Sequence, residues 1–247
     1  MKPAIKVIGV PNDINSSFMR GSSAAPPLIR EALFSASSNL FSESGLDLDQ
    51  IGIWEDLGDI ELSGEIEEES FKKIKTFVKD ILASDQKLVS LGGDHSVSWP
   101  ILDAHLDAWD TLDILHIDAH PDLYDSLLDN RLSHASPFAR VMETGRVNRL
   151  VQIGIRTLNK HQREQAEKFE VEIYQMRDLS KLSSLSFSKP VYCSIDIDAL
   201  DPAYAPGVSH FEPGGLSTRQ AIDYIKGFKG RLIGADIVEY NPKRDFH

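Results

Sequence analysis

Three short segments carry the acids and histidines that could do chemistry in this chain. They are GGDHS at residues 92–96, DAHPD at 118–122 and SIDID at 194–198. Along an extended backbone, side chains at alternate positions point to the same side, so Asp118, His120 and Asp122 are expected to share one face. Asp196 and Asp198 are expected to do the same. The spacing therefore indicates four carboxylates and a histidine presented together.

Such a cluster is electrostatically unstable by itself. Burying an unpaired carboxylate costs on the order of several kcal/mol, and divalent cations relieve that cost. With His95 and His120 added, the four carboxylates are enough to ligate two cations that share bridging carboxylates. Mixed nitrogen and oxygen ligands suit Mn²⁺ or Zn²⁺ better than Ca²⁺, and the absence of cysteine ligands argues against a structural zinc site. Two such cations, ~3.5 to 4 Å apart, can share a hydroxide that is nucleophilic at neutral pH. The residues therefore indicate metal-assisted hydrolysis.

Each motif has a plainer interpretation when it is taken alone. An Asp-x-Asp pair at a strand end more often caps a loop or stays solvated, and GGDHS could be only a turn with an aspartate cap. DAHPD is more specific, because acid, histidine and acid at alternate positions have few purely structural uses. His116 lies inside an apolar run and is interpreted as a core residue with its hydrogen bonds satisfied. The metal site is predicted from the joint occurrence of the three motifs.

The elements that must position these motifs are short apolar strands. Strands are predicted within AIKVIGV near the start, KLVSLGG at 87–93, DILHIDAH at 113–120, RLVQIGIR at 149–156, PVYCSIDID at 190–198 and RLIGADIVE at 231–239. Helical patterns lie between them, including APPLIREALFSA and EESFKKIKTFVKDILAS. This alternation predicts an α/β fold with a mainly parallel central sheet. In such sheets ligands bind beyond the carboxyl ends of the strands, where the three motifs fall.

Composition sets limits on the class of protein. A chain of 247 residues fits one α/β domain, which we predict to span residues 1–247. The net charge of -12, without any basic run, argues against nucleic-acid binding and weakly favours cationic substrates. No stretch is long and apolar enough to span a membrane. The only cysteine, Cys193, cannot form an intramolecular disulfide, and the first residues resemble a strand rather than a signal peptide, so a cytoplasmic location is expected.

Several longer motifs together resemble the ureohydrolase family of arginases, agmatinases and formiminoglutamases. They are GGDHS at 92–96, IDAHPDLYD at 117–125, SHASPFAR at 133–140, SIDIDALDPAYAPGVSHFEPGG at 194–215 and DIVEYNP at 236–242. The resemblance runs from VPNDINSSFMRG near the start to the last residue, and is closest to plant-type arginases and bacterial agmatinases. It implies a three-layer α/β/α sandwich, assembled as a homo-oligomer, either a trimer or a hexamer. It also implies a final helix that would follow NPKRD and is missing from this sequence.

The resemblance implies a dimanganese site whose hydroxide attacks a guanidino carbon and releases urea and an amine. The first Mn²⁺ would take His95, Asp118, Asp122 and Asp196, and the second would take His120, Asp118, Asp196 and Asp198, so that Asp118 and Asp196 bridge. Glu239 would bind the planar guanidinium through paired hydrogen bonds. His134 corresponds to the family's proton shuttle and also lines the substrate site. Asp122 would steer the hydroxide.

The expected substrate is a small cationic guanidino compound. Animal-type arginases carry an asparagine and a Thr/Ser-rich loop that bind the substrate carboxylate, whereas this chain has Tyr124 in that stretch. They also carry an aspartate after IGxR, where this chain has Thr157 to Asn159, and Asn159 is our candidate for substrate binding there. Because the amino-acid clamp is missing, agmatine, which would give putrescine, is slightly favoured. Arginine is the first alternative, followed by guanidinobutyrate and formiminoglutamate.

Two further interpretations stay open on the sequence alone. A deacetylase-like amidohydrolase shares the broad fold but uses a single zinc, so metal content would separate the two classes. A non-catalytic protein that works through assembly is expected to have lost one or more ligands. Every expected ligand position is filled here, as are the positions of Glu239 and His134, which argues against that second interpretation.

Overall fold

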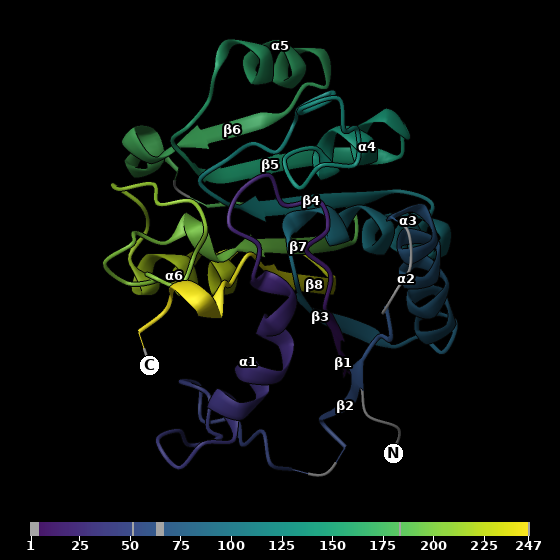
Figure 1. Cartoon of the computed structure of the whole chain (residues 1–247), viewed down its shortest axis with the longest axis vertical. Coiled ribbons are helices and arrows are strands. Elements are labelled where there is room, and N and C mark those ends of the chain that lie inside the picture. The colour runs from purple at the N-terminus through teal and green to yellow at the C-terminus, as the bar shows by residue number, and fades with distance from the viewer. Residues whose placement is uncertain (1–4, 51, 63–66, 183, 247) are drawn as a thin grey trace.

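The protein is built around one eight-stranded sheet. The computed structural model describes residues 5–50, 52–62, 67–182 and 184–246. The strands are β1 (Ile5–Val10), β2 (Trp54–Asp59), β3 (Lys87–Gly92), β4 (Leu112–Ile117), β5 (Val147–Ile155), β6 (Glu172–Gln175), β7 (Val191–Asp196) and β8 (Leu232–Val238). They lie in the order β2-β1-β3-β8-β7-β4-β5-β6, which Figure 1 shows from the lower edge of the sheet to the upper one. Every neighbouring pair is parallel.

Helices cover both faces of the sheet. The α-helices are α1 (Ala25–Leu33), α2 (Glu67–Leu82), α3 (Ser98–Trp109), α4 (Pro137–Glu143), α5 (Lys160–Lys168) and α6 (Thr218–Gly227). Short 3-10 helices are η1 (Ser22–Ala24), η2 (His95–Val97), η3 (Met176–Lys181), η4 (Ile197–Ala199) and η5 (Pro242–Arg244). The predicted helices at 25–36 and 68–84 correspond to α1 and α2. The expected three-layer α/β/α sandwich is confirmed, whereas one domain over residues 1–247 stays a prediction.

Two apolar clusters, one on each face, hold the layers together. On one face α2, α3 and α4 pack on alternate residues of the central strands, such as Ile114 of β4 and Tyr192 of β7. On the other face α6 and η3 pack on the intervening residues, such as Leu115 and Cys193. Because both faces are covered, all six residues of β4 are buried. This is why the central strands are nearly continuous apolar runs in the sequence.

The two strands that were not predicted lie at the edges of the sheet. β2 and β6 each have a neighbour on one side only. The β2 sequence, WEDLGD, is acidic and mostly exposed, and all four residues of β6 are only partly buried. An edge strand needs no continuous apolar run, so its sequence pattern is weak. The six predicted strands are the six inner ones.

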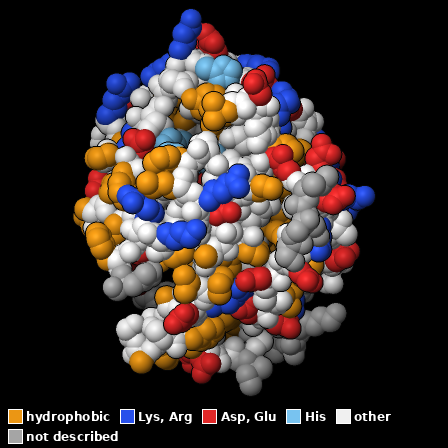
Figure 2. All heavy atoms as spheres, in the orientation of Figure 1, with side chains coloured by type: hydrophobic (Ala, Val, Ile, Leu, Met, Phe, Trp, Pro, Cys, Tyr) orange, Lys and Arg blue, Asp and Glu red, His pale blue; other side chains and the backbone are white. Residues whose placement is uncertain are grey.

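Figure 2 presents one side of the outer surface. Acidic, basic and hydrophobic side chains are interspersed on this face. Within the described residues, no helix has the length and the apolar character needed to cross a membrane.

Candidate metal centre

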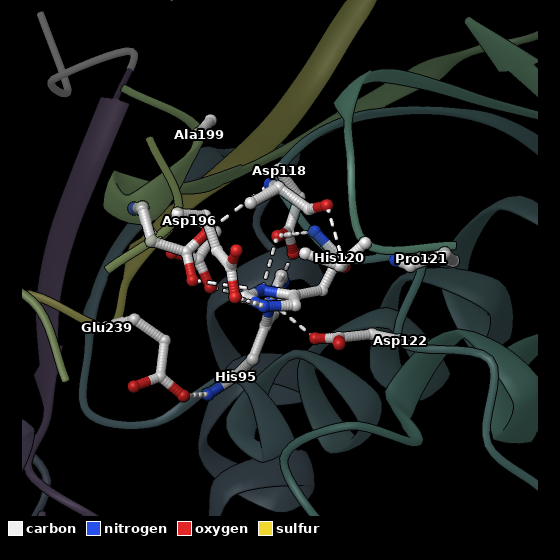
Figure 3. A network of polar contacts seen from close by, with 12 residues as sticks. His95, Asp118, His120, Pro121, Asp122, Asp196, Ala199 and Glu239 are labelled. Carbon is white, nitrogen blue, oxygen red and sulfur yellow. Dashed lines mark hydrogen bonds and ion pairs between the residues drawn. The ribbon is translucent and has the colours of Figure 1, made fainter. Parts of the chain in front are cut away.

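The predicted site residues gather where the inner strands end, as parallel strands require. His95 follows β3, Asp118 follows β4, Asp196 is the last residue of β7 and Glu239 follows β8. These four strands are contiguous in the sheet. Figure 3 shows the His95 ring at the centre of the group, with carboxylates around it. The strand-end rule therefore brings together residues that are far apart in the sequence.

The local backbone differs from the extended path that the sequence analysis assumed. β4 ends at Ile117, and the Asp118 Oδ1 then accepts a hydrogen bond from the His120 N–H at 2.6 Å, which turns the chain. Asp122 has φ of +49°, in the left-handed region. After β7, Asp196 caps η4 by accepting from the Asp198 N–H at 2.7 Å. The shared extended face was therefore a wrong premise, because each aspartate bonds to the backbone two residues on and tightens the turn.

Hydrogen bonds fix which ring nitrogen of His95 carries the proton. Tyr192 and Ser194 both donate to the buried Asp236, at 2.8 and 2.6 Å. Since the Ser194 hydroxyl proton is used on Asp236, its oxygen accepts from His95 Nε2, 2.9 Å away. The proton of a neutral His95 therefore sits on Nε2, and the lone pair of Nδ1 points into the carboxylate cluster.

The Nδ1 atom of His95 is the clearest sign that this cluster is suited to a cation. It lies 3.2 Å from Asp118 Oδ2, 3.0 Å from Asp122 Oδ2 and 3.2 Å from Asp196 Oδ2. It is buried, yet it makes no hydrogen bond within the described part of the chain. A lone pair facing three carboxylate oxygens is repulsive unless a positive charge lies between them. These four residues thus fit the first predicted metal position.

A second group of ligating atoms lies around His120. Its Nδ1 is 3.0 Å from Asp198 Oδ2 and 3.4 Å from Asp118 Oδ1. Asp118 thus offers one oxygen to each group, as a bridging carboxylate does. The atoms of Asp118, His120 and Asp198 are close enough to hold one ion together. The expected bridge through Asp196 stays a prediction, as does the assignment of individual ligands.

The electrostatics of the cluster favour bound cations. Burial raises the pKa of Asp196 well above its usual value, and the neighbouring Asp198 and Asp118 raise it further. Burial by itself lowers the pKa of His95, yet the three surrounding aspartates outweigh it and raise that pKa well above normal. The neighbouring carboxylates contribute to both shifts, because the site is dense in negative charge and strongly attracts a positive one.

His116 could also be counted among ligating atoms, because its Nε2 is 2.7 Å from Asp118 Oδ2. Its other nitrogen, Nδ1, accepts from Gln152 Nε2 at 3.0 Å, and the Gln152 amide also donates to the Pro121 carbonyl oxygen. Nε2 must then carry the proton, which it donates to Asp118. His116 is therefore a buried residue with both nitrogens bonded, as expected, and it orients a ligand rather than being one.

Glu239 and His134 form a second functional group beside the metal cluster. Glu239 has φ of +64°, and its Oε1 accepts from the His95 N–H at 3.0 Å and from His134 Nδ1 at 3.1 Å. His134 Nε2 lies 2.8 Å from the hydroxyl of Ser17. Burial lowers the pKa of His134, but the hydrogen bond and charge of Glu239 outweigh it and raise this pKa to about 9. The imidazole is therefore protonated at neutral pH.

A cleft of about 210 Å³ opens above both groups. It is lined by Ser17, His120, Asp122, Tyr124, Leu127, His134, Ala135, Thr157, Gln162, Asp196, Asp198, His210, Glu212 and Glu239. Asn159 is not among the lining residues. Its side chain caps α5 by accepting from the Gln162 N–H, and it donates to the hydroxyl of Tyr124. A contact between Asn159 and substrate stays a prediction.

Three of the lining residues that contact histidines of the site were not singled out from the sequence. Ser17 bonds to His134, His210 stacks on His134 with ring centroids 5.5 Å apart, and Glu212 approaches His120. They come from two loops, one with Ser17 and one with His210 and Glu212, that are far apart in the sequence. His210 and Glu212 lie inside the motif SHFEPGG, so the motif was noticed, but no spacing rule marks a lone side chain on a loop.

Comparison with known proteins agrees with the fold. The sequence model of the arginase family matches residues 3–247. The arginase of Glycine max is 46% identical, covering 97% of this chain and 72% of that protein. The N(1)-aminopropylagmatine ureohydrolase of Thermus thermophilus is 35% identical, covering 98% and 84%. The structure of the arginase from Medicago truncatula superimposes with a TM-score of 0.95 at 42% identity, covering 99% of this chain and 81% of that one.

The fold and site define a hydrolase with a His/Asp cluster suited to metal ions, acting on carbon–nitrogen bonds of guanidino-type groups. The chain belongs to the arginase family, the ureohydrolases.

Proposed function

We propose that this protein is a dimanganese arginase, which hydrolyses arginine to ornithine and urea. The observation that carries the metal part is the buried Nδ1 of His95, which lies 3.0 to 3.2 Å from three carboxylate oxygens. When bound, a pair of such cations supplies positive charge for a developing anion and acidifies water to a nucleophile near neutral pH. The first would be held by His95, Asp118, Asp122 and Asp196, and the second by His120, Asp118, Asp196 and Asp198.

Glu239 is suited to bind the guanidinium. Its Oε1 is occupied by two donors, whereas Oε2 has no hydrogen bond within the described residues, and the side chain lines the cleft. Burial raises the pKa of Glu239, but the hydrogen bond and charge of His134 prevail and lower it, so the carboxylate is ionised. A carboxylate beside a planar guanidinium forms strong charge-assisted hydrogen bonds. Glu239 therefore orients the carbon to be attacked.

His134 is suited to move a proton. Its Nδ1 proton faces Glu239, and its Nε2 faces the hydroxyl of Ser17 in the same cleft. The leaving amine of a guanidine needs a proton before it departs, and a protonated imidazole supplies one. Ser17 then offers a path by which the proton is replaced. Asp122, between His95 and the cleft, is placed to orient the attacking water.

The choice of arginine revises the slight preference for agmatine drawn from the sequence. The plant arginases are 43 to 46% identical to this chain over the aligned residues, and relatives named for other guanidino substrates are 34 to 35% identical. Agmatine remains a second candidate for one reason. Within the described residues, no lysine or arginine lines the cleft, so no basic side chain there could pair with the carboxylate of arginine.

A substrate panel tests this assignment. Protein loaded with Mn²⁺ is incubated separately with arginine, agmatine, 4-guanidinobutyrate and formiminoglutamate, and urea or formamide is measured. We expect urea from arginine at the highest kcat/KM. Urea from agmatine alone contradicts the arginase assignment but keeps the reaction class. No release from any of the four contradicts the proposed function.

The partners and location follow the same proposal. We expect a small cationic guanidino substrate, no nucleic acid or membrane partner, and a homo-oligomer, trimeric or hexameric. A cytoplasmic location was expected from the sequence, whereas several plant relatives carry names that place them in mitochondria or chloroplasts. Light scattering tests the oligomeric state, and localisation of the tagged chain tests the compartment.

A further inference from the structure

One acid in the cleft has no role in the chemistry described above. Asp122, Asp196 and Asp198 belong to the metal cluster, and Glu239 is assigned to the guanidinium. Glu212 is the remaining carboxylate among the residues that line the cleft. Its side chain is about one third exposed, at 34%. It can therefore meet a ligand that enters from solvent.

A row of three imidazoles separates Glu212 from Glu239. Glu239 bonds to His134, and the His134 ring stacks on His210 at 5.5 Å between centroids. His210 in turn lies 5.7 Å from the ring of His120, whose Nε2 is 3.5 Å from Glu212 Oε1. The two glutamates thus lie at opposite ends of the row. A substrate held at Glu239 by its guanidinium would have to extend along this row to reach Glu212.

The loop that carries Glu212 is fixed before any ligand arrives. The main-chain carbonyl oxygen of Glu212 accepts a hydrogen bond from Arg156 Nε at 2.8 Å. Asp201 Oδ2 accepts from the N–H groups of Gly214 and Gly215, at 2.7 and 3.1 Å. The guanidinium of Arg156 donates its hydrogen bonds to main-chain carbonyl oxygens, and Arg156 does not line the cleft. The main chain that carries the carboxylate is therefore held in place before a ligand binds, which lowers the cost of binding.

Only one oxygen of Glu212 is engaged. Oε1 faces His120, while Oε2 has no partner within hydrogen-bond distance in the described part of the chain. A hydrogen bond to a carboxylate oxygen leaves its charge and the second oxygen able to accept. An ammonium group, which has three donors, is the natural complement of such a group.

We propose that Glu212 binds the ammonium group of the substrate and so determines which guanidino compounds are substrates. Arginine and agmatine both carry this group on the carbon four positions from the guanidino nitrogen. This inference rests on the proposed function, because the guanidinium must be held at Glu239. A carboxylate-ended guanidino compound would meet a like charge at Glu212. The residue thus selects for an amine at the far end of the substrate.

A purely positioning role gives a different pattern. A carboxylate next to the distal nitrogen of a metal-binding histidine can orient that histidine and strengthen the metal site. Loss of such support would lower metal content and slow every substrate alike. Loss of an ammonium contact would affect only substrates that have the amine.

The test uses full-length, Mn²⁺-loaded wild type and Glu212→Gln, which keeps an oxygen to accept from His120. Each is assayed with arginine, agmatine, 4-guanidinobutyrate and n-butylguanidine, which keeps the guanidinium but lacks the amine. We expect kcat/KM for arginine and agmatine to fall roughly ten-fold or more, mainly through KM. For n-butylguanidine we expect less than about three-fold change. For 4-guanidinobutyrate we expect a rise, and manganese per chain should be unchanged.

Other outcomes overturn the inference. An equal fall for all substrates, or a loss of manganese, assigns Glu212 to positioning His120. Unchanged kinetics with arginine and agmatine would show that Glu212 has no role in binding.

The matched control is Glu68→Gln, which makes the same charge change at an exposed position of α2 and should behave as wild type. If wild type hydrolyses arginine but the pattern fails, only this inference falls. If wild type hydrolyses no guanidino compound, the proposed function falls and this inference falls with it.

Discussion

The floor and the mouth of the cleft are built differently. On the floor, Asp118 and His95 are fully buried, and each is held by hydrogen bonds to neighbours that are buried too. At the mouth, Glu212, His210 and Tyr124 are partly exposed and sit on loops. The floor residues are at or just beyond the ends of inner strands, whose positions the sheet fixes. We therefore expect the floor to determine the type of reaction and the mouth to determine which substrate is accepted.

This contrast is in keeping with relatives of different names that share one fold. The arginase of Medicago truncatula and an agmatine ureohydrolase structure from Thermoplasma volcanium both superimpose on this chain, with TM-scores of 0.95 and 0.85. A fold carries many specificities when the loops at its mouth vary and the floor does not. The following predictions test that division.

The largest effect is expected at His134, where floor and mouth meet. His134→Asn removes the group proposed to move a proton, so kcat should fall roughly 10²- to 10⁴-fold. Manganese content should stay as in wild type, because His134 is not placed among the ligands. Steady-state kinetics and metal analysis check this. His161→Asn, an exposed histidine outside the cleft lining, is the matched control. Wild-type turnover in the first variant contradicts the role of His134.

A smaller effect, on metal affinity, is expected at Ser194, which contacts His95 from below the cleft floor. Ser194→Ala removes the acceptor of the His95 Nε2 proton and leaves the ring free to rotate or change tautomer. Loss of such support typically lowers metal affinity about 10- to 100-fold. Competition with a chelator measures it. Ser90→Ala is a good control, because Ser90 is equally buried in β3 but its hydroxyl makes no hydrogen bond in the described residues. Equal effects in both variants would show that packing, not the hydrogen bond, matters.

The pairing of His134 with Glu239 should make stability depend on pH in the metal-free protein. The folded pKa of His134 is about 9, above its ordinary value of 6.5. The group therefore stabilises the fold fully below pH 6.5, and this contribution is lost as pH rises through 9. The free energy of unfolding, measured with urea, should be larger for wild type than for His134→Asn. The difference should be on the order of 3 kcal/mol at about pH 6 and much smaller at about pH 10. A difference that does not change with pH contradicts the ion pair.

The smallest effect is expected at Asn159, outside the cleft lining. Asn159→Ala removes the cap of α5 and should lower the free energy of unfolding by about 1 kcal/mol. Asn159→Asp keeps a capping oxygen but loses the amide that donates to Tyr124. If Asn159 acts only as a cap, Asn159→Asp should retain stability and KM. A raised KM in Asn159→Asp, with stability retained, would instead support the predicted role in substrate binding.

The same division shows what the sequence can predict. The inner strands were predicted because both faces are buried and each strand is a continuous apolar run, as in β4 and β7. The metal cluster was predicted because its members follow those strands, so strand order alone brings them together. The edge strand β2 was missed because it is acidic and exposed.

What could not be predicted depends on loop paths. The assumption of an extended DAHPD segment failed, since Asp118 bonds to the His120 N–H and turns the chain. The approach of Ser17 to His134 joins residues 117 positions apart, and no strand carries either of them. Glu212 and His210 reach the cleft through a loop held by Arg156 and Asp201. Such contacts are set by tertiary structure, not by periodicity.

The most direct test of the two-cation site is a count of metal ions. Purified wild type and Asp118→Asn are loaded with Mn²⁺, freed of excess metal and analysed for metal per chain. Because Asp118 offers one oxygen to each group, we predict two Mn²⁺ per wild-type chain and fewer than one in the variant. A single zinc per chain, or two Mn²⁺ retained by the variant, would contradict the account.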